Sequence, residues 1–262
     1  MVFKSAPVAL LSALFVGQAM AASTSELPAP VKALTERGLE VVGTFAAPGG
    51  LTGYAGTVQG QPIAVYLTSD GKHVVVGNML DENGKDLTSA PLDKLVNGPR
   101  NEAAWKKLPE SGWVRDGKED APRIIYMFDD PECPYCHKFW KEARPWVDAG
   151  KVQIRHVMVG IITRNSPDEA AVILASKDPA ALLAKHEQNY RGEGKNQLDA
   201  SKVPQSAHDK VQANAELMQE LGLSATPAIF YQKPDGSIGL LSGAPQGPLM
   251  EEVMGGPMPK GK

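Results

Sequence analysis

Residues 123–140 read RIIYMFDDPECPYCHKFW, and this stretch decides the fold. Residues 123–128 form a short continuous apolar run, which is typical of a buried strand. Residues 134–147 have the composition of a helix, and residues 151–159 form a second strand-like run. The sequence therefore predicts a βαβ unit with two parallel strands. Cys133 and Cys136 fall at the start of its helix.

A cysteine pair at this position is suited to redox chemistry. The exposed amides and partial positive charge of a helix N-terminus stabilise a thiolate. Cys133 is therefore the expected nucleophile, and Cys136, one turn into the helix, is placed to resolve a mixed disulfide. Pro134 suits the first helical position, where no amide donor is required. Nearby basic side chains are expected to lower the pKa of the thiol: His137, Lys138 and Lys141. Nearby acidic side chains are expected to raise it: Asp129, Asp130 and Glu132.

Other chemistries also fit the pair. The sequence from Cys133 to His137 matches the C-x-x-C-H pattern of c-type haem attachment, although haem attachment does not call for a preceding buried strand. A zinc site would need two more ligands from the five histidines or from carboxylates, because the chain has two cysteines in all. The last alternative is that both cysteines are only structural. Their close spacing disfavours this, because two unrelated cysteines would rarely fall three positions apart. We favour the redox interpretation, with no metal and no cofactor.

The first residues have the three parts of a secretory signal peptide. Lys4 supplies a positive charge, an apolar run of about 11 residues follows, and Ala19-Met20-Ala21 resembles a cleavage site. The run is shorter than the roughly 20 residues that span a bilayer as a helix. We therefore expect residues 1–21 to be removed and the mature protein to be exported, without stable membrane insertion. Export places the cysteine pair where dithiols can be oxidised.

Composition limits the class of protein and its partners. The 262 residues are 42% hydrophobic and 22% charged, which is ordinary for a globular chain of one or two domains. The formal net charge of −3 gives no general attraction for a phosphate backbone or an anionic membrane. Nucleic acid is therefore not an expected partner.

Patterning divides the mature chain into two parts. Residues 28–38 have helical spacing, and four β-branched or aromatic runs after them predict an antiparallel meander: residues 40–47, 54–59, 62–68 and 73–80. A polar linker helix is predicted over residues 91–109, which Gly98-Pro99 could interrupt. The later part continues after the βαβ unit with further predicted elements: helices within residues 166–222 around a polar stretch at 191–206, strands at 228–232 and 237–241, and a short helix near 248–253.

Thr226 and Pro227 stand at the entrance to the strand predicted at 228–232. An isolated Thr-Pro bond is expected to be trans, since only about one X-Pro bond in twenty is cis. Here the order of elements, from the βαβ unit through the helical stretch to Thr-Pro and a β-hairpin, resembles the thioredoxin fold. In that fold this proline is cis and packs beside the active-site cysteines, so the resemblance implies a cis Pro227.

The resemblance extends over essentially the whole mature chain. Segments 27–33, 143–148 and 173–180, together with the Cys-Pro-Tyr-Cys site and Thr-Pro-Ala, resemble those of the periplasmic thiol:disulfide interchange proteins of the DsbC/DsbG group. The resemblance implies an α+β chain in four parts: a signal peptide (1–21), a cystatin-like N-terminal dimerisation domain (22–90), a linker helix (91–111) and a thioredoxin-like catalytic domain with a helical insertion (112–262).

The same resemblance implies partners and roles. It implies a periplasmic homodimer that is reduced by the membrane protein DsbD and acts on exported client proteins with disulfides or oxidised cysteines, as isomerase, reductase and chaperone. The site residues that it implies are of three kinds: catalytic Cys133 and Cys136, substrate-binding Thr226, Pro227 and Tyr135, and thiol-tuning Pro134 and His137.

Two positions depart from thioredoxin itself. Met127 stands where thioredoxin has its buried acid, six residues before the first cysteine, so a carboxylate relay at that position is absent. Glu132 replaces the Trp of thioredoxin, which predicts a more acidic rim. Isomerase and reductase cycles both need a reduced resting pair, whereas a dithiol oxidase of the DsbA type, the main alternative, needs an oxidised pair and has no use for the N-terminal domain. A chaperone with incidental cysteines is the non-enzymatic alternative.

Overall fold

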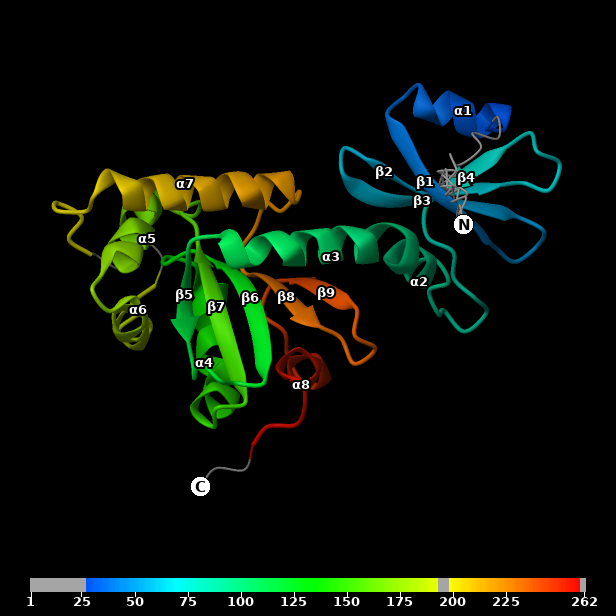
Figure 1. The fold of residues 1–262 in the computed structure, drawn as a ribbon. Coiled ribbons are helices and arrows are strands. Elements are labelled where there is room, and N and C mark those ends of the chain that lie inside the picture. The colour runs from blue at the N-terminus through cyan, green and yellow to red at the C-terminus, as the bar shows by residue number, and fades with distance from the viewer. Residues whose placement is uncertain (1–26, 193–197, 260–262) are drawn as a thin grey trace, which may run out of the picture.

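The computed structural model describes residues 27–192 and 198–259. The predicted signal peptide, residues 1–21, lies outside the described residues. The chain forms a four-stranded sheet and a five-stranded sheet, joined by a long helical segment (Figure 1). Helices pack on both sheets, which confirms the predicted α+β class.

The N-terminal part is one helix on an antiparallel meander. Its elements are α1 (Ala29–Thr35), β1 (Leu39–Ala46), β2 (Thr52–Val58), β3 (Gln61–Leu67) and β4 (Val74–Val76). Val31 of α1 is fully buried in a small core with Leu39, Tyr54 and Val65 of the sheet. The strands pair in chain order, as the sequence predicts.

The fourth strand is shorter than predicted. Residues 73–80 form a strand only over Val74–Val76, and the chain leaves the sheet at Gly77, whose φ is 141°. Thr88 holds the departing segment, because its hydroxyl accepts from the Met79 amide at 2.7 Å and bonds the Tyr66 hydroxyl at 2.5 Å. The sequence could not show that this side-chain contact replaces strand pairing.

The linker helix is continuous from Ser89. It consists of α2 (Ser89–Leu92), a π-helical turn (Asp93–Asn97) and α3 (Gly98–Lys107), and a 3₁₀ turn (Leu108–Glu110) ends it. Pro99 lies in the first turn of α3, and the wider turn before it accommodates the missing amide. The predicted interruption at Gly98-Pro99 is therefore wrong, and the helix begins two residues before the predicted start.

The C-terminal part is a five-stranded sheet between helices. Its elements are β5 (Trp113–Asp116), β6 (Arg123–Asp129), α4 (Pro134–Asp148), β7 (Val152–Met158), α5 (Ser166–Ala175), α6 (Pro179–Gln188), α7 (Gln205–Glu220), β8 (Ala228–Gln232), β9 (Ile238–Ser242) and α8 (Pro248–Met254). The strand order is β5-β7-β6-β8-β9, and β6 and β7 are parallel, which confirms the βαβ unit. Strand β5 is an addition that the sequence analysis missed.

The central strand β6 divides two cores. Ile125 and Met127 face the core that contains α4 and α8, while Tyr126 and Phe128 face the core that contains α3 and α7. Helix α3 is thus part of the second core, where Leu108, just beyond its end, is also fully buried. Helices α5 and α6 lie beyond the β5 side of the sheet, and α7 extends from them along the sheet (Figure 1).

No helix among the described residues is long and apolar enough to cross a membrane.

Candidate active site

The turn between β6 and α4 places both cysteines. Cys133 is the residue that caps α4, and its sulfur accepts from the amide of Cys136 at 3.4 Å. Pro134 is the first residue of the helix, as predicted. The turn itself is closed by a hydrogen bond from the Cys133 amide to the Asp130 carbonyl, 2.9 Å long. Both thiols are free.

The Thr226-Pro227 peptide lies against this turn. The bond is cis, which confirms the expectation from the resemblance. The Cys133 thiol donates to the Thr226 carbonyl at 3.4 Å, although the two residues are 93 positions apart. The structure therefore brings Cys133, Cys136, Thr226 and Pro227 together at one end of the sheet.

The two thiols differ in their acidity. The hydrogen bond with Cys136 lowers the pKa of Cys133, helped by Thr226 and opposed by burial and by the charge of Asp129. Burial raises the pKa of Cys136 well above its ordinary value, and the contact with Cys133 and the charge of Asp129 add to this. At neutral pH Cys133 is therefore the more readily ionised thiol, and Cys136 holds its proton.

Neither cysteine is exposed at the surface. Cys133 is 2% exposed and Cys136 is fully buried, because the Thr226-Pro227 loop covers the helix start. The exposed residues of the motif are Pro134 and Tyr135, and Tyr135 is 61% exposed. The burial of both sulfur atoms also counts against haem attachment, since each sulfur would have to reach the edge of a large ring.

The predicted acidic rim is wrong. Glu132 is fully buried, so it does not shape the surface that a client meets. Asp130 is buried as well, and its carboxylate accepts from the amides of Glu132, Ile161 and Ile162 at 2.6 to 2.9 Å. Burial raises the pKa of Asp130, and these amide bonds oppose the rise. The function of Asp130 here is to fix the active-site turn to the loop after β7.

His137 contacts the helical insertion, which consists of α5, α6 and α7 between β7 and β8. Its Nδ1 lies 2.8 Å from Oε2 of Glu187, and its ring stacks on Tyr190 with centroids 4.5 Å apart. The same insertion holds the turn, because Tyr190 donates to the Glu132 carbonyl at 2.9 Å and His186 Nε2 lies 2.8 Å from the Pro131 carbonyl. The insertion therefore holds the cysteine turn through Pro131, Glu132 and His137.

A second buried group lies behind the cysteines, and the sequence analysis missed its basic member. Asp129 at the end of β6 pairs through Oδ2 with Nδ1 of His156 on β7 at 2.6 Å, and both side chains are completely buried. The signal in the sequence was a lone histidine inside an apolar strand. Such a residue needs a buried partner, but nothing in the sequence identifies that partner.

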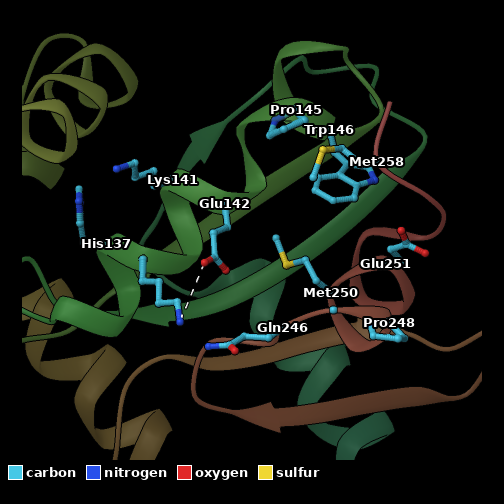
Figure 2. A pocket seen from close by; sticks show the side chains of 12 residues that line it. His137, Lys141, Glu142, Pro145, Trp146, Gln246, Pro248, Met250, Glu251 and Met258 are labelled. Carbon is cyan, nitrogen blue, oxygen red and sulfur yellow. Dashed lines mark ion pairs between the residues drawn. The ribbon is translucent and has the colours of Figure 1, made fainter. Parts of the chain in front are cut away.

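A cavity of about 1020 Å³ lies along α4, and its lining begins at His137, the residue after Cys136. Figure 2 shows His137, Lys141, Glu142 and Trp146 of α4 on one side and Met250 and Glu251 of α8 on the other. Lys138 and Glu142 form an ion pair across one helical turn at 4.0 Å. Among the described residues, no group of three or more His, Cys, Asp or Glu side chains is arranged to hold a metal ion.

Two family models match the chain. Residues 115–255 match the thioredoxin-like domain, and residues 18–89 match the disulfide bond isomerase protein N-terminal domain. Among solved structures, a linker-deletion variant of Proteus mirabilis ScsC is 22% identical, covers 61% of this chain and 82% of that chain, and gives a TM-score of 0.50. These matches confirm the predicted fold of the C-terminal part.

Curated relatives cover almost the whole chain. The thiol:disulfide interchange protein DsbG of Pseudomonas aeruginosa is 47% identical over 236 residues, which are 90% of this chain and 91% of that protein. DsbG of Escherichia coli K12 is 43% identical over 235 residues, 89% of this chain and 94% of that protein. Thiol:disulfide interchange protein DsbC of the same strain is 25% identical over 168 residues, 63% of each chain.

Proposed function

The chain belongs to the DsbC/DsbG family of thiol:disulfide interchange proteins, and on that premise we propose that it isomerises and reduces disulfides of exported proteins, with Cys133 as nucleophile and Cys136 as resolving thiol. The observation that carries the proposal is the contrast between the two thiols. One caps the helix with a lowered pKa, and the other is fully buried with a raised pKa.

The reaction begins when the Cys133 thiolate attacks one sulfur of a client disulfide. The client S–S bond breaks, a Cys133–client disulfide forms, and the released client sulfur takes up a proton. Another client thiol can then attack the client sulfur of this mixed disulfide, which gives a rearranged client and regenerates Cys133. Alternatively, Cys136 attacks Cys133, which releases reduced client and leaves the protein oxidised.

The same site can act on a single oxidised cysteine. The Cys133 thiolate attacks the sulfur of a sulfenic acid, water leaves, and the same type of mixed disulfide forms. Cys136 then releases the client as a free thiol. Rescue of such cysteines therefore uses the reductase exit and needs no additional group.

Contacts with the client are assigned to the residues around the sulfur. Tyr135 is 61% exposed, and Thr226, next to Pro227, contacts the Cys133 thiol through its carbonyl. A client backbone that passes between them would present its sulfur to Cys133. Pro134 and His137 act on the thiol less directly. Pro134 is the first residue of α4, and His137 anchors α4 to the insertion through Glu187.

The setting of this activity follows from the family and from the predicted signal peptide. We place the mature protein in the periplasm as a homodimer that joins through its N-terminal domains. DsbD is the proposed source of electrons for the oxidised pair. The two catalytic domains would then face a shared cleft that holds clients, including unfolded ones.

Refolding of a scrambled-disulfide test protein, such as scrambled ribonuclease, tests the function. We expect catalytic amounts of the reduced protein to restore ribonuclease activity, Cys133→Ser to abolish this, and Cys136→Ser to keep part of the isomerase activity while losing reduction. With reduced, unfolded ribonuclease as the substrate instead, formation of disulfides by the oxidised protein alone would indicate an oxidase of the DsbA type. If the double Cys→Ser variant still assists refolding of a client without disulfides, while the wild-type protein leaves scrambled ribonuclease unchanged, the protein is a chaperone alone.

A further inference from the structure

Two carbonyl groups of the active-site turn are held from the C-terminal end of α6. The carbonyl of Pro131 accepts from Nε2 of His186 at 2.8 Å, and the carbonyl of Glu132 accepts from the Tyr190 hydroxyl at 2.9 Å. A carbonyl oxygen can only accept, so His186 and Tyr190 are the donors. These two carbonyls belong to the residues that directly precede Cys133 in the chain.

The two donors are themselves held in place. The side chain of His186 is 6% exposed, and its ring meets that of Tyr190 edge-on with centroids 6.4 Å apart. The Tyr190 ring stacks on His137 of α4 at 4.5 Å, and His137 bonds Glu187, the residue after His186, at 2.8 Å. The end of α6 therefore grips the start of α4 through a packed group of rings.

The peptide between Glu132 and Cys133 determines where the Cys133 side chain points. Its carbonyl is bonded by Tyr190, and its N–H group donates to the Asp130 carbonyl at 2.9 Å. With both polar atoms bonded, the plane of this peptide is fixed. Pro134 restricts the backbone on the other side of Cys133. The direction of the Cys133 side chain therefore depends on the donors that hold the turn.

The Cys133 sulfur depends on this direction for its contacts. It lies 3.4 Å from the Cys136 amide nitrogen and 3.4 Å from the Thr226 carbonyl oxygen. Hydrogen bonds weaken as their distance and angle change, so rotation of the turn would cost the sulfur these contacts. The hydrogen bonds with Cys136, and to a lesser extent with Thr226, lower the pKa of Cys133. Their loss would leave less thiolate at neutral pH.

We propose that His186 and Tyr190 are positioning residues for the reaction. By holding the two carbonyls before Cys133, they keep its sulfur against the Cys136 amide and the Thr226 carbonyl, and so control how readily it attacks a client. This inference rests on the proposed function, because it concerns the thiol that acts as the nucleophile. It gives the helical insertion a part in the chemistry.

The carboxylates around the turn cannot replace these two donors, because an ionised carboxylate only accepts. The charge of Asp129 raises the pKa of Cys133, so it opposes the thiolate. Asp130 accepts from backbone amides of the turn and of the loop after β7. Glu187 bonds His137. The hold on the two carbonyls therefore comes from His186 and Tyr190.

Titration of the Cys133 thiolate tests the proposal. The ultraviolet absorbance of the reduced mature protein is followed with pH, and that of the oxidised protein is subtracted to remove the other chromophores. Tyr190→Phe removes the hydroxyl and keeps the ring that stacks on His137. We expect its midpoint to lie higher than that of the wild type. The thiolate fraction below the midpoint should fall about fivefold, the factor that one hydrogen bond of ordinary strength corresponds to.

The matched control is Tyr66→Phe. It also removes one tyrosine hydroxyl from a buried hydrogen bond, here with Thr88 in the N-terminal part of the chain. We expect the wild-type midpoint in this variant, because the lost bond is not part of the active-site turn.

His186 supplies a second pair of variants, which decides the matter if Tyr190→Phe does not fold. His186→Leu removes the donor to the Pro131 carbonyl, whereas His186→Gln provides a side-chain amide that can donate in its place. We expect the midpoint to rise in His186→Leu and to return most of the way to the wild-type value in His186→Gln. Equal midpoints in these two variants would contradict the proposal.

The equilibrium with glutathione gives an independent measurement. A thiolate that is less stabilised makes the reduced form less favourable, so Tyr190→Phe and His186→Leu should shift toward the oxidised protein. Wild-type midpoints and equilibria in both variants would overturn the proposal, and so would a loss of stability toward urea with an unchanged midpoint. If the wild-type protein does not rearrange scrambled ribonuclease, the proposed function fails, whereas the titrations still test the positioning of Cys133.

Discussion

At the scale of single residues, the site depends on the side chains that surround each sulfur. Cys133 and Cys136 are the same residue type, three positions apart, yet their pKa values move in opposite directions. The difference arises because hydrogen bonds from the side chain of Cys136, and to a lesser extent from its amide, lower the pKa of Cys133, whereas complete burial raises the pKa of Cys136. Position in the helix thus decides which thiol attacks and which resolves.

The charge on His156 also predicts how stability depends on pH. Its folded pKa of about 9 exceeds the ordinary value of 6.5, so the folded protein binds this proton more tightly than the unfolded chain does. The stability that this provides is complete below pH 6.5 and is lost as pH rises through 9. We expect the free energy of unfolding of the wild-type protein to fall by roughly 2 to 3 kcal/mol more than that of His156→Asn over this range.

Urea unfolding at a series of pH values measures this difference. His156→Asn should be the less stable protein at pH 6.5, and the gap should narrow toward pH 9. Parallel stability curves for the two proteins would show that His156 is not charged in the folded state. Comparison of the two proteins cancels the titration of groups that both share.

The sequence predicts a residue's role well only where its interactions are with neighbours along the chain. The Cys-x-x-Cys spacing, the N-cap and Pro134 are local features, so the sequence was sufficient for them. The partners of Asp129, His137 and Glu132 come from strands and helices far along the chain. Glu132 is buried, so the surface around the site is not made acidic by it, contrary to the prediction. Local composition around a motif does not show which side chains turn inward.

At the scale of elements, α3 contributes to the catalytic part more than a linker would. Trp105 packs edge-on against Tyr126 with centroids 5.1 Å apart, and Asn101 donates to the Ile238 carbonyl at 3.1 Å. Arg100 bonds the Gly60 carbonyl at 2.8 Å and also the Leu221 carbonyl, so it ties both parts of the chain to the helix. These contacts close the face of the second sheet that lies opposite α4.

A pair of fragments tests the role of α3. We expect residues 89–262 to unfold cooperatively and at a higher urea concentration than residues 112–262. The free energy of unfolding should be larger by several kcal/mol, because the shorter fragment exposes Tyr126 and Phe128 to water. Urea unfolding followed by tryptophan fluorescence and by circular dichroism measures this. Equal stability of the two fragments would mean that the helix only spaces the domains, as the sequence analysis assumed.

The elements that the sequence predicted wrongly are the short ones. Strand β5 has four residues, too few for alternation to be visible, and it is defined by pairing with β7. Strand β4 has three residues, all paired with β3, and beyond it the Met79 amide bonds the Thr88 hydroxyl instead of a strand. Long periodic elements such as α4 and β6 were predicted well, since their own residues carry the pattern.

At the scale of the whole molecule, the N-terminal sheet ends in two edge strands, which pair with no further strand of residues 27–192 and 198–259. Strands β1 and β4 are the edge strands, and Val42, Val75 and Val76 on them are about half exposed, at 53%, 58% and 48%. Exposed apolar side chains on edge strands favour pairing with another chain. A small sheet of this kind also buries too little surface to be stable alone.

Sedimentation tests where the dimer forms. We expect residues 22–90 to sediment as a dimer, and residues 89–262 to be a redox-active monomer with little isomerase activity, because one client could no longer contact two catalytic domains. A monomeric N-terminal fragment would contradict this arrangement. So would a C-terminal fragment that isomerises scrambled disulfides as well as the whole protein does.

The central claim is that Cys133 attacks clients and Cys136 resolves, and trapping of mixed disulfides tests it most directly. Cys133→Ser and Cys136→Ser proteins are produced with their signal peptides, thiols are blocked by alkylation at harvest, and disulfide-linked partners are separated on non-reducing gels. The account predicts that Cys136→Ser accumulates mixed disulfides through Cys133, since the buried thiol that would release them is gone, and that Cys133→Ser accumulates none. Trapped clients in Cys133→Ser and none in Cys136→Ser would contradict it.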